Sequence, residues 1–138
     1  MIKPGDVFRF HDYKFTDGSK QDKLFVILND YTSDGSAVCL TVITTSQERH
    51  YSNVLEGCNL HKAVFMIPKD RECFPKDTYI KMLPIYPFSL GKVLKESIGK
   101  VIEDYGNLSD RCLCELLRCL NNFKDDIAAE HYKILFPR

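Results

Sequence analysis

The sequence contains no tryptophan, carries no net charge and has no apolar stretch approaching about 18 residues. Because 19 lysine and arginine residues balance 19 aspartate and glutamate residues, no overall field attracts nucleic acid or a lipid surface. Any nucleic-acid contact must therefore come from a local basic patch. The N-terminal residues also lack an apolar segment followed by a cleavage site, so we expect a cytoplasmic protein that makes no contact with membranes.

The six cysteines occur at irregular spacings and do not suggest a disulfide framework. We expect reduced thiols, with Cys112 and Cys119 packed as small apolar groups on one flank of a helix. Cys58 and His61 have the C-x-x-H spacing of some zinc sites, but the second close ligand pair is missing. No metal site and no cofactor are therefore expected.

A chain of 138 residues with 44% hydrophobic residues can bury one core, so residues 1–138 are expected to form one domain. Turn-forming segments separate runs of β-branched and aromatic residues, which indicates short strands. The expected strands are Val7–His11, Leu24–Asn29, Val38–Thr45, Ala63–Ile67, Thr78–Leu83 and a weaker one at Lys100–Glu103. Five or six strands of this length favour a small SH3-like β-barrel, which leaves no long edges unpaired, in a mainly β (α+β) protein.

The C-terminal part changes to a helical pattern. Ser109 can cap a helix in which Leu113, Leu116, Leu117 and Leu120 recur on one face, which predicts an amphipathic helix against the barrel. A second short helix is expected within Asp125–Leu135.

Several short motifs follow one another in an order that resembles the PemK/MazF family of toxin endoribonucleases. They are Pro4-Gly5-Asp6, Lys23-Leu24-Phe25-Val26-Ile27-Leu28, Val42-Ile43-Thr44-Thr45-Ser46, Asp77-Thr78-Tyr79-Ile80-Lys81, and Ile98-Gly99-Lys100-Val101 followed by Leu108-Ser109-Asp110. Together they span nearly the whole chain. The resemblance implies a PemK-like barrel and a toxin that cleaves single-stranded RNA without a metal, by driving the 2′-hydroxyl onto the adjacent phosphate.

The resemblance also implies the site residues. An arginine followed by proline precedes the central strand in the family, and a threonine ends the third strand; the matching positions here are Lys23-Leu24 and Thr45, with Ser46 beside it. Such groups suit a transition state that gathers negative charge on the phosphate oxygens. Lysine lacks the two-pronged grip of guanidinium, so Lys23 departs from the family pattern. The proton-transfer group is left open among His11, Asp12 and His50.

Further residues are expected to contact RNA from the loops and strand ends around this site: Lys20, Gln21, Gln47, Arg49 and Lys81. Tyr79, Tyr86 and Phe88 offer faces on which bases can stack, although aromatic residues among prolines also commonly cover the end of a barrel. By resemblance, the partners are single-stranded RNA, a small antitoxin protein and a second copy of the chain in a homodimer.

Other interpretations fit the same residues. Lys23 is also suited to precede a hydrophobic strand as an ordinary charged residue, and Thr44, Thr45 and Ser46 are common at strand ends. The chain would then be a non-catalytic SH3-like barrel that binds RNA or a protein. A third alternative is a toxin of related fold that poisons DNA gyrase, which the absence of a C-terminal tryptophan makes the weakest of the three.

Overall fold

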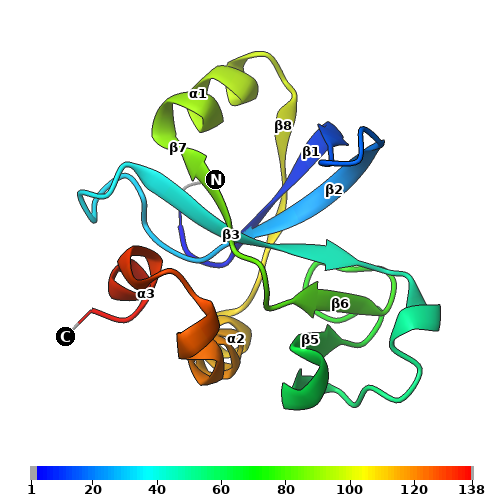
Figure 1. The fold of residues 1–138 in the computed structure, drawn as a ribbon. Helices are drawn as coiled ribbons and strands as arrows, with labels where there is room; N and C mark the ends of the chain where they lie inside the picture. Colours follow the sequence, from blue (N-terminus) through cyan, green and yellow to red (C-terminus); the bar gives the residue numbers. More distant parts are fainter. Residues whose placement is uncertain (1–2, 138) are drawn as a thin grey trace.

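The computed structural model describes residues 3–137, except the side chain of Glu48; in this part of the chain eight strands form an antiparallel sheet accompanied by three α-helices (Figure 1). The strands are β1 (Asp6–Lys14), β2 (Lys20–Ile27), β3 (Val38–Thr45), β4 (Gly57–Asn59), β5 (Val64–Ile67), β6 (Thr78–Lys81), β7 (Tyr86–Ser89) and β8 (Ile102–Asn107). The helices are α1 (Leu90–Ile98), α2 (Asp110–Leu120) and α3 (Ala129–Leu135), with 3-10 turns η1 (Glu48–His50), η2 (Leu60–Lys62) and η3 (Asn121–Asp126). The mainly β, α+β prediction agrees with this architecture.

The expected closed barrel is wrong. The strand order is β4-β5-β6-β3-β2-β1-β8, and β7 also pairs with β3, so among the described residues the two end strands β4 and β8 do not meet. The reason lies in β3, whose first half pairs with β7 and whose last two residues, Thr44 and Thr45, pair with β6. The sheet therefore forks along β3 instead of closing on itself.

Each face of the central strands carries its own core. On one face, Phe25 of β2 lies beside Ile43 of β3, and its ring is 5.4 Å from that of Phe8 and 5.3 Å from that of Phe88. Val93 of α1 belongs to the same buried cluster.

The opposite face is covered by the C-terminal helices. Val26 and Val42, which alternate with the residues of the first face, pack in a cluster with Leu116 and Leu120 of α2. Figure 1 shows α1 on one side of β3, with α2 and α3 on the other. Residues 25–27 of β2 and 39–44 of β3 are thus buried on both faces of the sheet, in agreement with the continuous apolar run in β2.

The predicted helix at the C-terminal end is confirmed. The Oγ of Ser109 accepts a hydrogen bond from the backbone N–H of Cys112 at 3.2 Å, which caps α2. The second helix is shorter than expected: Ile127 has extended backbone angles and separates η3 from α3, which begins only at Ala129. The irregular segment lets the side chain of Ile127 enter the core, where it is buried.

The expectation that all thiols are reduced is wrong for one pair. Cys58 of β4 and Cys119 of α2 form a disulfide, with their Cα atoms 5.6 Å apart. Cys39, Cys73, Cys112 and Cys114 remain free. The irregular cysteine spacing gave no signal for this bond, because it joins segments that are 61 residues apart in the sequence.

Candidate nucleic-acid interface

Lys23 and Thr45 line the same cavity, just beyond the last residue pair of the β2–β3 ladder. Phe25 pairs with Ile43 in this antiparallel ladder, and Lys23 and Thr45 are the residues two further along their respective strands. Side chains two apart on a strand share a face, so the lysine and the hydroxyl stand on the same side of the sheet. The β3–β6 ladder adds Tyr79 directly opposite Thr45.

An open cavity of about 530 Å³ lies over this position. Its lining includes Gln21, Lys23, Thr45, Gln47 and Lys81, five of the residues expected to act on or bind RNA. They come from β2, from β3 and the residues that follow it, and from β6, which are far apart in the sequence. The structure therefore brings these predicted residues together.

The cavity contains two lysines, Lys23 and Lys81, whose positive charges interact. Burial lowers the pKa of Lys23 from 10.5, and the positive charge of Lys81 lowers it further. Within the described side chains, neither lysine forms an ion pair. Two ammonium groups held together without compensation form a place where an anion is stabilised.

The carboxylate at the rim of this cavity is already engaged. Asp17 accepts hydrogen bonds from the backbone N–H of Ser19 at 2.8 Å and from its hydroxyl at 2.6 Å. Bonding to the Ser19 hydroxyl and backbone N–H lowers the pKa of Asp17, so this carboxylate is ionised and fixed in the turn between β1 and β2. Among the described side chains Asp17 forms no ion pair with Lys23 or Lys81, so both lysines can contact an anion from outside.

The hydroxyl of Thr45 has a defined orientation. Its oxygen accepts a hydrogen bond from the backbone N–H of Gln47 at 3.2 Å, so the hydroxyl hydrogen is directed elsewhere. Thr45 is partly exposed, which lets that hydrogen reach a bound phosphate oxygen. This is the arrangement that a donor to a developing negative charge requires.

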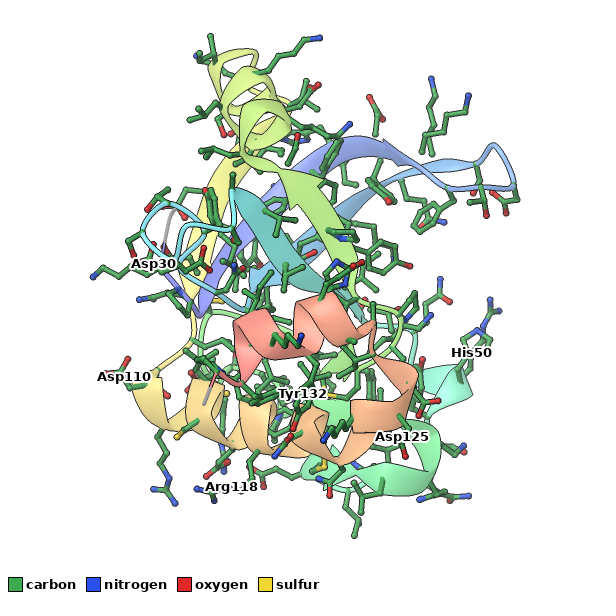
Figure 2. All side chains as sticks on the ribbon, turned by 60° about the vertical axis from the view of Figure 1, so that its left-hand side comes forward. Asp30, His50, Asp110, Arg118, Asp125 and Tyr132 are labelled. Atoms are coloured by element: carbon green, nitrogen blue, oxygen red, sulfur yellow. A yellow bond between two sulfur atoms is a disulfide. The ribbon has the colours of Figure 1, made fainter. Side chains whose placement is uncertain are left out.

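Only one of the three candidates for proton transfer lies at the cavity. His50, in η1, lines it and is exposed at the surface (Figure 2), with Nε2 3.3 Å from Nε of Arg49. His11 is held elsewhere, with Nδ1 3.2 Å from Asp22 and Nε2 2.9 Å from Glu103. Asp12 lines neither this cavity nor the smaller one described below.

Aromatic rings form the walls of the cavity. Tyr51 lines it and stacks on Tyr79 with ring centroids 5.0 Å apart, and Tyr86 lines it from β7. Burial raises the pKa of both Tyr51 and Tyr86, so their hydroxyls stay protonated and can donate hydrogen bonds. The rings and hydroxyls suit the stacking and edge contacts that unpaired bases make.

A second cavity of about 260 Å³ shares Lys23, Thr44 and Thr45 with the first. It lies toward the opposite face of the sheet, because its lining includes Leu24 and Phe74, which belong to or pack against the helix-covered core. Ser46 lines this smaller cavity and not the larger one. The end of β3 thus forms a ridge between two adjoining hollows.

Two of the predicted RNA contacts are not at either cavity. Lys20 and Arg49 are exposed and line neither, although each neighbours a residue that does. Sequence reasoning also missed Tyr51, Lys76 and Tyr105, which line the two hollows. Tyr51 directly follows His50 in the loop after Thr45, which is the one signal that could have drawn attention to it.

The zinc alternative does not fit the structure. The Sγ of Cys58 is bonded to that of Cys119 and has no thiolate to offer a metal. In residues 3–137, no group of three or more histidine, cysteine, aspartate or glutamate side chains is arranged to hold a metal ion.

A larger hollow of about 620 Å³ lies elsewhere, between η3 and α3. Ile127, Tyr132 and Phe136 give it a mainly apolar lining, and Lys124 lies over the ring of Tyr132 at 5.2 Å. Two lysines, Lys124 and Lys133, also line it, but no histidine or threonine accompanies them, so its size does not make it the better candidate for phosphate chemistry.

Comparisons of the sequence with protein-family models and with curated proteins give no match. The functional interpretation therefore depends on the residues and geometry described above. In the described part of the chain, no helix combines the length and apolar character needed to cross a bilayer.

Proposed function

We propose that this protein is an endoribonuclease of the PemK/MazF toxin type that cleaves single-stranded RNA by attack of a 2′-hydroxyl on the adjacent phosphate. The observation that carries the proposal is the pair of ammonium groups, Lys23 and Lys81, beside the Thr45 hydroxyl in one open cavity, where neither forms an ion pair with a described side chain. The reaction needs charge stabilisation and proton transfer, which these side chains can supply without a metal or cofactor.

Lys23 and Lys81 are assigned to the phosphate. In the free protein the two positive charges repel each other, which raises the free energy of the folded state. A phosphate bound between them offsets this repulsion, so binding recovers part of that free energy. Because the cavity partly excludes water, this interaction is stronger than the same contact on an open surface. Lysine grips the phosphate less directionally than arginine, and the second lysine offsets that loss with additional charge.

Thr45 and His50 are assigned to the chemical step. The Thr45 hydroxyl donates to a non-bridging oxygen, where negative charge increases as the attacking oxygen adds to phosphorus. The imidazole of His50 accepts the proton of the 2′-hydroxyl, since imidazole exchanges protons readily near neutral pH. The bond between phosphorus and the 5′ oxygen then breaks, and the leaving oxygen takes up a proton from solvent, which gives a 2′,3′-cyclic phosphate and a free 5′-hydroxyl.

The partners follow from the same proposal. A toxin of this type acts in the cytoplasm, forms a homodimer, and is inhibited by a small antitoxin that occupies the RNA groove. An antitoxin segment of acidic character would suit the paired lysines, because carboxylates can take the place of phosphates there.

The main alternative is a non-catalytic RNA-binding protein that uses the same cavity. The observation that favours it is the presence of Lys23 where the toxin family has arginine. In that case, the lysines and aromatic walls would bind RNA, and the backbone would remain intact.

The deciding experiment incubates the purified protein with a mixed-sequence single-stranded RNA in a chelator, and with the same oligonucleotide carrying 2′-O-methyl groups. We expect new ends with cyclic phosphate from the RNA alone, and retarded migration but no cleavage of the methylated strand. Retardation of both strands without cleavage of either would favour the non-catalytic alternative. If neither strand were bound or cut, the proposed function would be wrong.

A further inference from the structure

The smaller hollow beside the candidate site has a basic and aromatic lining of its own. Besides the residues it shares with the larger cavity, it is lined by Lys76 from the segment before β6 and Tyr105 from β8. Lys76 is exposed and Tyr105 is half-buried. Like the larger cavity, the smaller hollow thus combines a cation with an aromatic ring. The two lie on opposite sides of the end of β3.

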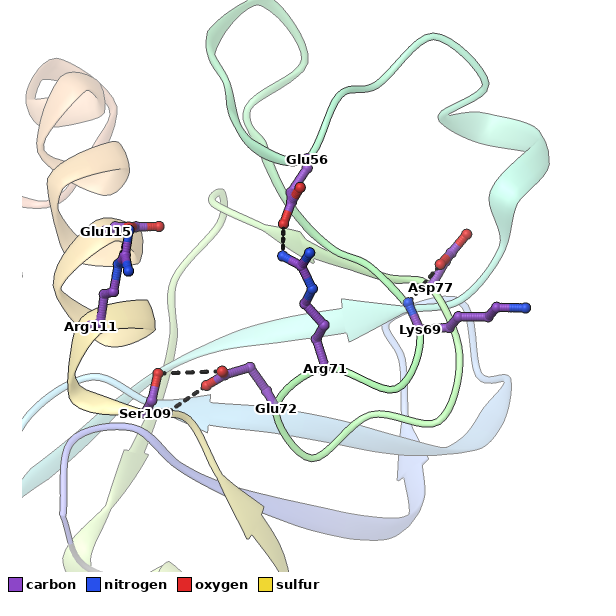
Figure 3. Close-up of polar contacts among 8 residues, drawn as sticks. All are labelled: Glu56, Lys69, Arg71, Glu72, Asp77, Ser109, Arg111 and Glu115. Carbon is purple, nitrogen blue, oxygen red and sulfur yellow. Dashed lines mark hydrogen bonds and ion pairs between the residues drawn. The ribbon is translucent and has the colours of Figure 1, made fainter.

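The segment that carries Lys76 is held in a fixed conformation. The Oγ1 of Thr78 donates a hydrogen bond to the Lys76 carbonyl at 2.9 Å, and the backbone N–H of Lys69 donates to Oδ1 of Asp77 at 2.7 Å (Figure 3). The N–H of Asp70 also donates to the Phe74 carbonyl at 2.9 Å. These bonds limit the motion of the backbone that carries Lys76 at the wall of the hollow.

The ring of Tyr105 is also supported from within. It stacks on the buried ring of Phe74 with centroids 6.3 Å apart, and the guanidinium of Arg9 lies 5.1 Å from its centroid. Contacts with Phe74 and Arg9 hold the ring in place, so the part that remains exposed can contact a base with little loss of entropy. Arg9 adds a further positive charge near this surface.

The carboxylate in the smaller hollow is engaged by the protein. Asp22 accepts hydrogen bonds from the backbone N–H of Asp12 at 2.9 Å and contacts Nδ1 of His11 at 3.2 Å. Hydrogen bonding, first from Asp12 and then from His11, lowers the pKa of Asp22. No contact joins this carboxylate to Lys76 among the described side chains, so Lys76 is available to an anion.

We propose that Lys76 and Tyr105 form a second nucleotide-binding subsite, and that the RNA strand crosses the end of β3 from one hollow to the other. This inference rests on the proposed function, because it extends the same substrate beyond the phosphate held at Lys23. Lys76 binds a phosphate next to the one that is cleaved, and the exposed part of Tyr105 contacts a base. Lys81, Lys23 and Lys76 then follow the backbone of one strand, as in other grooves that bind single-stranded nucleic acid.

The test compares the parent with Lys76→Ala, Tyr105→Leu and Lys62→Ala. Lys62 is an exposed lysine in η2 that lines neither hollow, so its removal is the matched control for lost charge. Binding is measured by fluorescence anisotropy with mixed 2′-O-methyl hexanucleotides, and cleavage with RNA hexanucleotides and with dinucleotides. Dinucleotides have a single phosphate and do not span both hollows.

We expect Lys76→Ala and Tyr105→Leu to weaken hexanucleotide binding roughly tenfold, which corresponds to the loss of one charged or stacked contact. The salt dependence of binding should fall by about 0.7 in the log-log slope for Lys76→Ala, and dinucleotide cleavage should be unchanged. Lys62→Ala should resemble the parent. The subsite is wrong if the parent binds and cleaves hexanucleotides while Lys76→Ala and Tyr105→Leu match Lys62→Ala. A parent that neither binds nor cleaves any of these RNAs instead overturns the proposed function, and the subsite with it.

Discussion

Lys23 and Lys81 face one cavity from β2 and β6, and the charge of Lys81 adds to burial in lowering the pKa of Lys23. Two like charges in this position raise the free energy of the free protein and favour a bound anion. In sites that bind or react with anions, charged groups are commonly placed where they lower the stability of the folded protein. Substituting Lys23 therefore tests directly whether its positive charge acts in the reaction.

We expect Lys23→Ala to reduce RNA cleavage by at least about a hundredfold, because it removes the charge nearest Thr45. Lys23→Arg should preserve or raise the rate, since guanidinium keeps the charge and adds a two-pronged contact with phosphate. Single-turnover cleavage of a labelled oligonucleotide measures both. A Lys23→Ala protein as fast as the parent would show that another group acts as the cation.

Thr45→Ala should lower the single-turnover rate by roughly 10²- to 10³-fold while leaving RNA affinity within a few-fold, because the hydroxyl acts mainly on the transition state. Thr45→Ser keeps the hydroxyl and should retain most of the activity. Anisotropy with 2′-O-methyl RNA measures the affinity separately from the rate. Equal rates for the alanine and serine variants would contradict the assignment.

The strands were the most predictable part of the fold. Val38–Thr45 was expected with the bounds that β3 has in the structure, because β-branched residues fill it and turn residues precede it. The sequence predicts that the preceding strand starts at Leu24, but β2 starts at Lys20. The first four residues were missed because three of them are charged and one is polar. They pair with β1 beyond a bulge, where Tyr13 faces Gln21, and this pairing needs no apolar pattern.

The segment of residues 86–98 was missed entirely. Pro87 argues against a strand, yet β7 pairs only with β3 among the described strands, so the missing N–H of the proline costs little. Gly91 lowers helix propensity in α1, but Ser89 caps this helix by accepting a hydrogen bond from the N–H of Lys92 at 3.1 Å. Packing of Val93 into the aromatic core outweighs the weak local preference.

The presence of Lys23 and Thr45 at one site could be predicted, because Lys23 directly precedes the apolar run of β2 and Thr45 ends the strongly patterned strand β3. Lys76 and Tyr105 could not, since they reach the site only through the long-range placement of β6 and β8. The fork at β3 depends likewise on which strands pair, and strand composition does not encode this choice.

The disulfide between Cys58 and Cys119 closes a loop of 61 residues and attaches β4 to α2. The chain-entropy estimate for a loop of this size is a stabilisation of about 4 kcal/mol. We expect Cys58→Ser to lower the midpoint of thermal unfolding by more than 10 °C, as measured by circular dichroism without reductant. Cys114→Ser alters an exposed free cysteine and serves as the control, with little change expected. Equal midpoints for the two variants would show that the bond does not stabilise the fold.

Gly106→Ala should destabilise the protein by several kcal/mol, because a Cβ at this position of β8 would lie 2.6 Å from Cβ of Cys73. Gly91→Ala is the matched control: no atom lies within 4 Å of its added Cβ, and alanine favours the helix by about 0.5–1 kcal/mol. Urea unfolding of both variants gives the comparison. The packing of β8 against the Cys73 segment would be in error if the two substitutions changed stability alike.

Alkaline pH should destabilise the protein through Cys39. Burial raises its pKa from 9.0 to about 12, so the thiol stays protonated in the folded state while the unfolded chain ionises. The stabilisation is complete below pH 9 and is lost as the pH rises from 9 toward 12, by about 1.4 kcal/mol per pH unit. Urea unfolding between pH 8 and 10.5 should show a shallower decline for Cys39→Ala than for the parent. Identical slopes would mean that this thiol is accessible to solvent.

β3 contributes side chains to both buried clusters, and its last residues form the ridge between the two hollows. Substitutions within it thus disturb two cores and the chemistry together. The rims, by contrast, come from connecting segments around Asp17, Gln47 and Lys76, which lie outside both clusters. We therefore expect related proteins to differ mainly in the length and composition of these loops, and we expect the loops to determine which RNA sequences are bound. The residues at the end of β3, between the two hollows, should vary less.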